Sequence, residues 1–255
     1  MVADVDLIEA ADRNFLGSYR KLVDHMLAGE TRDFGGVFAF VTGLPIGMFN
    51  GCIVTAPAAT EDLRSALDWI VGHDVPYRLW IHEELADHLA EAVRERGMEQ
   101  GAWLMPQMVL QPVPETPSPA PGVSVRAVSD ARSLDEYRRV SVEDGTSENV
   151  VGRLYSDSFA ADPDVQLVTA YLDHRAVGTS LAIRTGEVSG VYAVGTLPAA
   201  RRRGVGTAAT WAAVAAGRAL GCESIVLQAS EMGFPLYRAM GFRTVVRYSL
   251  FRPSA

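Results

Sequence analysis

The chain of 255 residues is 48% hydrophobic and 21% charged, with a formal net charge of −8. A chain of this kind buries a core as one large domain or two small ones. Its acidic balance argues against a general nucleic-acid binder, which needs basic side chains to neutralise phosphates. Cys52 and Cys222 are the only cysteines and lie far apart, which argues against a disulfide framework and a metal site. We therefore expect a reduced, cytoplasmic compartment and no metal.

The first half of the chain reads as alternating strands and helices. Residues 34–60 contain no charged side chain, and a segment of that length is long enough to span a bilayer. Its many glycines and prolines are typical of turns and strand ends, so a buried hairpin is favoured and no membrane partner is expected. The predicted elements are strands at 37–41 and 46–54, a helix at 61–71, a strand at 77–81, a helix at 85–96 and a strand at 98–110.

A proline-rich segment follows at residues 112–122, which hold five of the 13 prolines. Proline removes backbone donors and favours an extended conformation, so this segment is predicted to be a semi-rigid connector. It divides the chain into a first domain at 1–111, the linker at 112–122 and a second domain at 123–255.

The second half changes its hydrophobic period repeatedly. Its order of elements predicts an α/β (α+β) fold in which a mixed sheet has helices on both faces. The first half repeats this order of elements in a degenerate form, so two tandem α/β halves of similar order are predicted. The elements expected here are a strand at 123–127, helices at 134–140 and 150–159, strands at 165–172, 176–184 and 188–194, a helix at 204–220, a strand at 224–228, a helix at 234–240 and a strand at 242–251.

The strongest chemical signal is the loop between the strand at 188–194 and the helix that follows it. The first amides of a helix lack internal acceptors and lie at the positive end of its dipole. Gly204 and Gly206 let a diphosphate approach the backbone closely, and the run Arg201-Arg202-Arg203 adds positive charge. The sequence therefore predicts a diphosphate cradle, although a merely solvated basic run is the alternative.

Other diphosphate-binding loops fit this segment less well. Gly204-Val205-Gly206 also matches the start of a dinucleotide fingerprint, but that fingerprint needs a strand ending at the first glycine and a full nucleotide-binding half afterwards. Here the strand ends at Val194 and little chain remains after Gly206. A P-loop is excluded because no Lys-Ser/Thr pair follows the glycines.

Two motifs together resemble the GNAT superfamily of N-acyltransferases. Pro198-x-x-Arg201-x-x-Gly204-x-Gly206 resembles the Arg/Gln-x-x-Gly-x-Gly/Ala pattern of its motif A, and Leu236-Tyr237-x-x-x-Gly241-Phe242 resembles its downstream Leu-Tyr-x-x-x-Gly-Phe signature. They stand in the expected order, with a helix and a strand between them. The resemblance covers residues 123–251 and, more weakly, the first half, so it implies GNAT-like folds in tandem.

The resemblance implies acetyl-CoA as the acetyl donor. Its pantetheine arm would pair like an extra strand with the backbone of Val194, Gly195 and Thr196. Tyr237 would protonate the departing thiolate, which a phenol can do. Ser230 stands where many members carry an asparagine, so a contact from Ser230 is in doubt. The pyrophosphate would lie on the loop formed by Arg201, Arg202, Arg203, Gly204, Val205, Gly206 and Thr207.

The acceptor is expected to be a primary amine of a small molecule or a peptide, which must lose a proton before it attacks the thioester. The strand at 188–196 holds no carboxylate, so a base has to come from elsewhere. Glu143 and Asp144, in the loop after the first helix of this half, are the candidates, acting through water. Transfer is expected to be direct, in a ternary complex, without an acyl-enzyme.

Rival readings stand beside this one. The chain could be an acetyl-CoA-binding or sensing module without turnover, or a partner-binding protein whose motif has decayed. Tyr237 could be a core residue of a short amphipathic helix, and Glu143 and Asp144 could be ordinary loop residues. The first half lacks an arginine-and-glycine loop, so it is predicted to bind no CoA and to shape the acceptor cleft. The sequence leaves the oligomeric state open, and a homodimer is one alternative.

Overall fold

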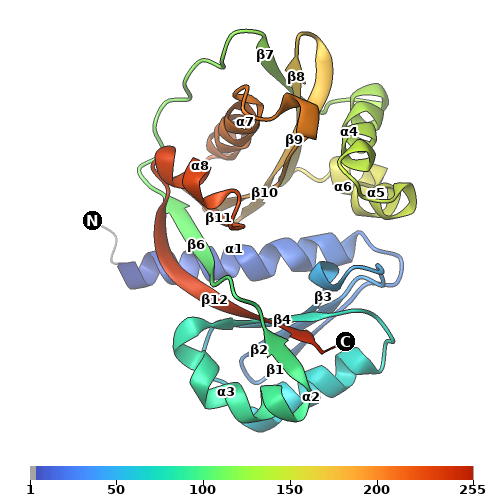
Figure 1. Ribbon diagram of the computed structural model, residues 1–255, viewed down its shortest axis with the longest axis vertical. Coiled ribbons are helices and arrows are strands. Elements are labelled where there is room, and N and C mark those ends of the chain that lie inside the picture. The colour runs from blue at the N-terminus through green and yellow to red at the C-terminus, as the bar shows by residue number, and fades with distance from the viewer. Residues whose placement is uncertain (1–3, 255) are drawn as a thin grey trace. The chain divides into compact units, whose positions relative to one another are not determined.

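The computed structural model describes residues 4–254, which form two compact units (Figure 1). The first unit combines the chain up to Met108 with the segment from Gln228 onward, and the second is Val109–Leu227. The linker-based division places residues 228–255 in the second domain, but here they pack with the first unit. The reason is that the last strand pairs there, with Tyr248 opposite His82.

The first unit holds a mixed sheet with the strand order β1-β2-β3-β4-β12, and β5 pairs with β12. Strands β3 and β4 are parallel, whereas β12 runs antiparallel to β4. Its elements are α1 (Asp4–Asp24), β1 (Glu30–Phe34), β2 (Val37–Val41), the 3-10 helix η1 (Gly47–Phe49), β3 (Asn50–Val54), α2 (Thr60–Val71), β4 (Arg78–His82), α3 (Glu83–Glu95), β5 (Met98–Gln100), β6 (Met105–Leu110), α8 (Phe234–Ala239) and β12 (Arg243–Pro253); β6 ends in the second unit.

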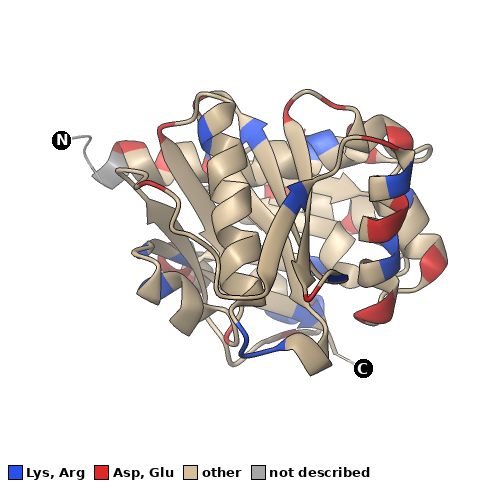
Figure 2. Ribbon diagram, turned by 90° about the horizontal axis from the view of Figure 1, so that it is seen from above, with Lys and Arg blue, Asp and Glu red and all other residues tan. Residues whose placement is uncertain are grey.

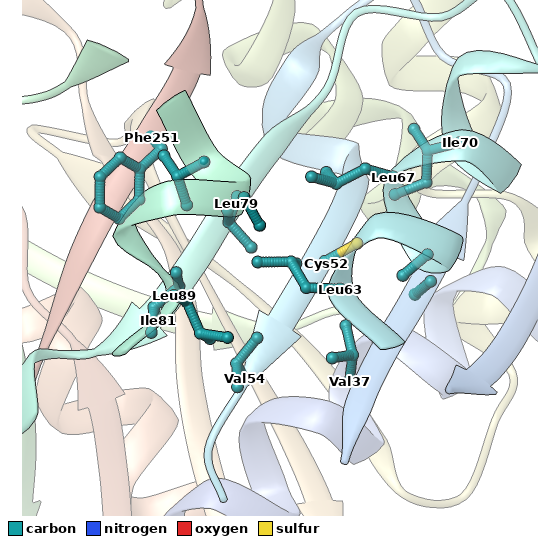
Figure 3. Packing of buried hydrophobic residues seen from close by; sticks show 14 of the residues in the cluster. Val37, Cys52, Val54, Leu63, Leu67, Ile70, Leu79, Ile81, Leu89 and Phe251 are labelled. Atoms are coloured by element: carbon teal, nitrogen blue, oxygen red, sulfur yellow. The ribbon is translucent and has the colours of Figure 1, made fainter. Parts of the chain in front are cut away.

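The core of this unit lies between the sheet and the helices α2 and α3 (Figure 3). Helix α2 contributes Leu63, Leu67 and Ile70, whose spacing puts them on one face of the helix. Phe251 of β12 reaches the same cluster. Because β12 supplies both backbone pairing and this side chain, the end of the chain is part of the core of the first unit.

Helix α1 lies outside the predicted elements. It buries Leu7, Ala11 and Phe15 at four-residue intervals, a helical pattern. The buried carboxylate of Asp12 fastens the helix to the sheet: its Oδ1 accepts hydrogen bonds from the Tyr248 hydroxyl at 2.7 Å and the Gln107 amide at 2.7 Å. Burying a carboxylate requires such partners, and here strands distant in sequence supply them.

The second unit holds a mixed sheet with the order β11-β10-β9-β8-β7. Strands β10 and β11 are parallel and the other pairs are antiparallel. Figure 1 shows α7 and α4 on opposite faces of this sheet. The elements are β7 (Val123–Ala127), α4 (Ala131–Glu143), α5 (Glu148–Leu154), α6 (Asp157–Ala160), β8 (Val165–Leu172), β9 (Arg175–Thr185), β10 (Val188–Thr196), the 3-10 helix η2 (Pro198–Ala200), α7 (Val205–Ala219) and β11 (Ser224–Gln228).

Three predicted elements differ from the structure. The single helix expected at 150–159 is α5 followed by α6, because Ser156 starts a new helix by accepting a hydrogen bond from the Phe159 amide. The strand expected at 98–110 is interrupted between β5 and β6. The strand expected at 46–54 begins at Asn50, after η1.

The uncharged stretch at 34–60 supplies β2 and β3, which pair antiparallel from Val37 opposite Val54 to Val41 opposite Asn50. This is the hairpin predicted from its glycines and prolines. Among residues 4–254, no helix is long and apolar enough to cross a membrane.

The proline-rich segment lies along α7. Arg218, near the end of α7, donates a hydrogen bond to the carbonyl of Pro114 at 3.1 Å. At the other end of the helix, a Cβ on Gly204 would lie 2.8 Å from the Cβ of Ala120. The segment therefore runs antiparallel to α7 and ends beside the loop that precedes it.

Replacing Gly217 of α7 with alanine should destabilise the protein. A Cβ there would lie 2.7 Å from Ser189 Cβ and 2.7 Å from Ile225 Cδ1. Overpacking of this kind costs about 1–3 kcal/mol, which outweighs the gain of about 1 kcal/mol in helix propensity. We expect a lower midpoint of thermal denaturation for Gly217→Ala. In the matched control Gly152→Ala on α5, where a Cβ meets nothing within 4 Å, the midpoint should stay or rise; a Gly217→Ala protein as stable as wild type would contradict the packing argument.

Candidate functional site

The loop between β10 and α7 adopts a conformation that exposes backbone amides. Gly204 precedes the first residue of α7 with φ of 83°, and Arg202 has φ of 62°. Both are left-handed conformations that L side chains seldom adopt. The amides of Val205, Gly206 and Thr207, in the first turn of α7, lack intrahelical acceptors. The chain therefore presents free donors at the positive end of the helix dipole.

Basic side chains surround these amides. Figure 2 shows the basic loop beside the N-terminal end of α7, whose own residues are uncharged apart from Arg218. Arg201 Nε donates to the carbonyl of Thr196 at 3.1 Å, and Arg203 lies 3.2 Å from Asp173. Arg202 is exposed and makes no ion pair with any residue in the described range. Backbone amides at a helix N-terminus and guanidinium groups are the kinds of donor that bind anions in proteins.

Strand β10 leaves one of its edges open beside this loop. It pairs with β11 only from Val188 to Gly190, whereas on its other side it pairs with β9 up to Thr196. Beyond Gly190, no residue of β11 within the described chain is in register with β10. The backbone of Val194, Gly195 and Thr196 therefore has an edge that an extended ligand can pair with.

A β-bulge interrupts β10 at this edge. Tyr192 lies opposite Leu181 and Gly195 lies opposite Thr179, so two residues of β10 face one residue of β9. Ala193, one of these two, has φ of 49° and is exposed. The bulge is the place where the alternation of side chains along β10 changes.

The two candidate carboxylates at the end of α4 point in different directions. Asp144 Oδ2 lies 3.0 Å from the position that a Cβ on Gly195 would take, and its Oδ1 lies 3.9 Å from Arg201. Partial burial raises the pKa of Asp144, and the Arg201 charge opposes this. Glu143 instead lies 3.4 Å from Arg175. Of the two, Asp144 is the one that lies against β10.

Tyr237 and Ser230 belong to the first unit. Tyr237 lies in α8, is 8% exposed and packs edge-on against Phe242, with ring centroids 6.0 Å apart. Burial raises the pKa of its phenol to about 12. The Ser230 hydroxyl accepts a hydrogen bond from the Gly233 amide at 3.1 Å and so helps to start α8.

Three neighbouring residues of β9 support this region and escape prediction from the sequence. Thr179 Oγ1 donates to the carbonyl of Ala193 at 3.1 Å, and Ser180 Oγ donates to the carbonyl of Ala209 at 2.7 Å. Gly178 lets α7 approach, because a Cβ there would lie 2.7 Å from Val205 Cγ1. A glycine inside a strand is the one local signal of such a close approach.

The equivalent region of the first unit is built differently. There β3 pairs with β4 from Gly51 to Val54, which is the end of β3. Helix α2, which follows β3, carries Glu61 and Asp62 in its first turn. The strand edge is thus closed and the helix start is negatively charged, an arrangement that disfavours a diphosphate. Over the described range, histidines, cysteines and carboxylates form no group of three suited to a metal ion.

Residues 132–242 match the model of the acetyltransferase (GNAT) family. This part of the chain contains both predicted motifs, so the match and the motifs agree on the GNAT family for these residues. The match supports acetyl transfer from acetyl-CoA as the class of activity. No curated protein has significant sequence similarity to the chain.

Solved structures of GNAT proteins share the fold. A GCN5-related N-acetyltransferase from Kribbella flavida matches with a TM-score of 0.69 and 20% identity over 97% of this chain and 95% of its own. One from Sphaerobacter thermophilus matches with a TM-score of 0.63 and 17% identity over 86% and 78%. A tandem GNAT protein from the clavulanic acid biosynthesis pathway matches with a TM-score of 0.60 and 12% identity over 90% and 86%. The predicted GNAT-like α/β fold is confirmed.

Replacing Asp144 with asparagine should stabilise the folded protein at neutral pH. Its pKa is raised in the folded state, so the unfolded chain ionises first as the pH rises through about 4. Folding is penalised from there upward, and the full penalty is present above the folded-state pKa. We expect a higher midpoint of thermal denaturation for Asp144→Asn at pH 7, by a small margin because the side chain is 34% exposed. The difference should vanish below about pH 4; an asparagine protein less stable than wild type at pH 7 would contradict the direction of the shift.

Proposed function

We propose that the protein is an N-acetyltransferase that moves the acetyl group of acetyl-CoA to a primary amine of a small molecule or a peptide. The observation that carries this proposal is the open edge of β10 next to the N-terminus of α7. Acetyl-CoA joins an extended amide-containing arm to a diphosphate. The arm would need a free strand edge, and the diphosphate would need a helix N-terminus beside that edge.

The residues present fit such a donor. The amides of Val205, Gly206 and Thr207 would hold the pyrophosphate, and Arg202 would add charge without giving up an existing ion pair. The edge from Val194 to Thr196 would pair with the pantetheine amides. When bound, acetyl-CoA supplies an activated acetyl thioester.

Asp144 is proposed as the base. An alkylamine has a pKa near 10 and is a cation at neutral pH, so it must lose a proton before it can attack. Asp144 lies against Gly195 of the open edge, and its raised pKa brings the carboxylate closer in basicity to the amine. Its negative charge also attracts a cationic acceptor. Glu143, which lies beside Arg175, is not part of this proposal.

Tyr237 is proposed as the acid that protonates the departing thiolate, on the strength of the Leu-Tyr-x-x-x-Gly-Phe motif. A pKa of about 12 keeps the phenol protonated at neutral pH, as an acid must be. Direct transfer is favoured over an acyl-enzyme because burial raises the thiol pKa values of both cysteines, Cys52 and Cys222, and a buried thiol is a poor nucleophile.

Acetyl-CoA should stabilise the wild-type protein against heat, and the Gly206→Glu variant should lose this response. A ligand at 100 times its dissociation constant adds about 2.7 kcal/mol to the stability of the native state. A glutamate at the second residue of α7 would repel a diphosphate from the amides. The measurement is a thermal-shift titration, with Gly152→Glu, which adds the same charge on α5, as the matched control. A wild type that does not respond would refute the donor site.

Replacing Tyr237 with phenylalanine should slow acetyl transfer while leaving acetyl-CoA binding unchanged. Loss of a general acid lowers the rate by at least about a hundredfold, and the ring that packs on Phe242 is retained. The measurement is CoA thiol release with a panel of primary amines, beside the thermal shift on the same variant. An unchanged rate would assign Tyr237 to packing alone, and binding without thiol release in wild type would favour a sensing module.

A further inference from the structure

The bulge of β10 holds one residue in an unfavourable conformation. Ala193 has φ of 49°, a left-handed conformation that brings the Cβ of an L residue too close to the following carbonyl oxygen. Strain of this kind persists only where the surroundings fix it, and it gathers at functional sites. The bulge lies where β10 has already parted from β11, so β11 does not hold it in place.

The contact that fixes the bulge comes from β9. Thr179 is 5% exposed, and its Oγ1 donates a hydrogen bond to the carbonyl of Ala193 at 3.1 Å. In the sheet register Thr179 lies opposite Gly195, two residues further along. Thr179 therefore spans the bulge, since its backbone pairs beyond Ala193 and its side chain holds Ala193 itself.

The next residue holds the helix on the other face of the sheet. Ser180 is fully buried, and its Oγ donates to the carbonyl of Ala209 in α7 at 2.7 Å. Ala209 lies one turn after Val205, so this bond sets the height of the first turn of α7 above the sheet. Gly178 on the same strand has no side chain, so Val205 of α7 can pack close to the strand.

We propose that Thr179 and Ser180 are positioning residues that set the open edge of β10 and the start of α7 in one fixed relation. Successive strand residues point to opposite faces, so two adjacent hydroxyls can reach the bulge and the helix at once. The inference rests on the proposed donor site: the edge would take the pantetheine arm and the helix start would take the pyrophosphate. Neither Thr179 nor Ser180 needs to touch the donor.

The two hydroxyls should therefore act on different parts of the donor. Losing the Thr179 hydroxyl frees Ala193 to leave its strained conformation, which disturbs the edge at Val194 to Thr196 but leaves α7 in place. Losing the Ser180 hydroxyl frees the first turn of α7, which disturbs the diphosphate cradle. A ligand with the diphosphate but without the pantetheine arm distinguishes the two effects.

The experiment compares acetyl-CoA with ADP, which carries a diphosphate and no pantetheine, by calorimetric titration of the full chain. Thr179→Val keeps the shape of the side chain and removes the donor, and Thr179→Ser keeps the donor as the matched control. We expect Thr179→Val to bind acetyl-CoA about tenfold more weakly, the affinity equivalent of one lost hydrogen bond. Its affinity for ADP should stay that of wild type, and Thr179→Ser should bind both ligands as wild type does. Ser180→Ala should lose affinity for both ligands.

Several outcomes would overturn the inference. Thr179→Val could bind acetyl-CoA as wild type does, could lose ADP and acetyl-CoA to the same extent, or could be matched in its loss by Thr179→Ser. Thermal denaturation without ligand shows whether each variant is folded, and Thr179→Ala gives a second test of the same comparison if the valine protein is not. A wild type that binds neither ligand would refute the donor site itself and the inference with it. A wild type that binds both, with unaffected Thr179→Val, refutes the inference alone.

Discussion

The proposed donor site depends on the separation of β10 from β11 after Gly190. Backbone N–H and C=O groups inside a sheet need hydrogen-bond partners, so an edge that β11 leaves unpaired can be paired by a ligand. Two parallel strands that stay paired hydrogen-bond to each other and leave no free backbone amides or carbonyls along that edge for a ligand. Here β10 keeps its pairing with β9, which holds the strand in place, while its other edge from Val191 to Thr196 has no partner strand among residues 4–254. The loop after Thr196 then leads directly into α7, so a free strand edge and a helix N-terminus follow each other along the chain.

The first unit illustrates what happens without that parting. It has a similar succession of strand, helix and strand in β3, α2 and β4, but β3 and β4 are paired through Val54. Its helix begins with Glu61 and Asp62 where the second unit has Gly206 and Thr207. Similar topology thus carries opposite electrostatics and a closed edge. Within its described residues, the first unit therefore has no comparable ligand-binding edge, and its core includes Phe251 of β12.

Burial shifts the pKa of the proposed base and the pKa of the proposed acid in the same direction, but the consequence differs between the two groups. It raises the pKa of Asp144 and of Tyr237, since in both cases the charged form loses solvation. For a carboxylate the result is a stronger base. For a phenol the result is a group that stays protonated at neutral pH. Neither shift requires a metal ion or a neighbouring like charge.

The sequence by itself determined most of the order of the elements from β2 onward, the mixed α/β class and the loop from Arg201 to Thr207, whereas α1 and β1 lie outside the predicted elements. These are local properties: hydrophobic period, the position of glycine and proline, and the spacing of charged residues along a few turns. Even α1, which was not predicted, has a local signal in Leu7, Ala11 and Phe15. Interruptions such as the one between α5 and α6 depend on a single cap, Ser156, and are harder to recognise.

Only the tertiary structure decided which parts of the chain meet. The preference for Asp144 over Glu143 depends on how the end of α4 lies over Gly195, and adjacent residues cannot be told apart by type alone. The roles of Thr179 and Ser180 depend on the register between β9 and β10, which a shift of one residue would reverse. The place of β12 in the first unit depends on its pairing with β4. Each of these is a long-range pairing, set by the burial and hydrogen bonding of the whole sheet, and no window of sequence contains both partners.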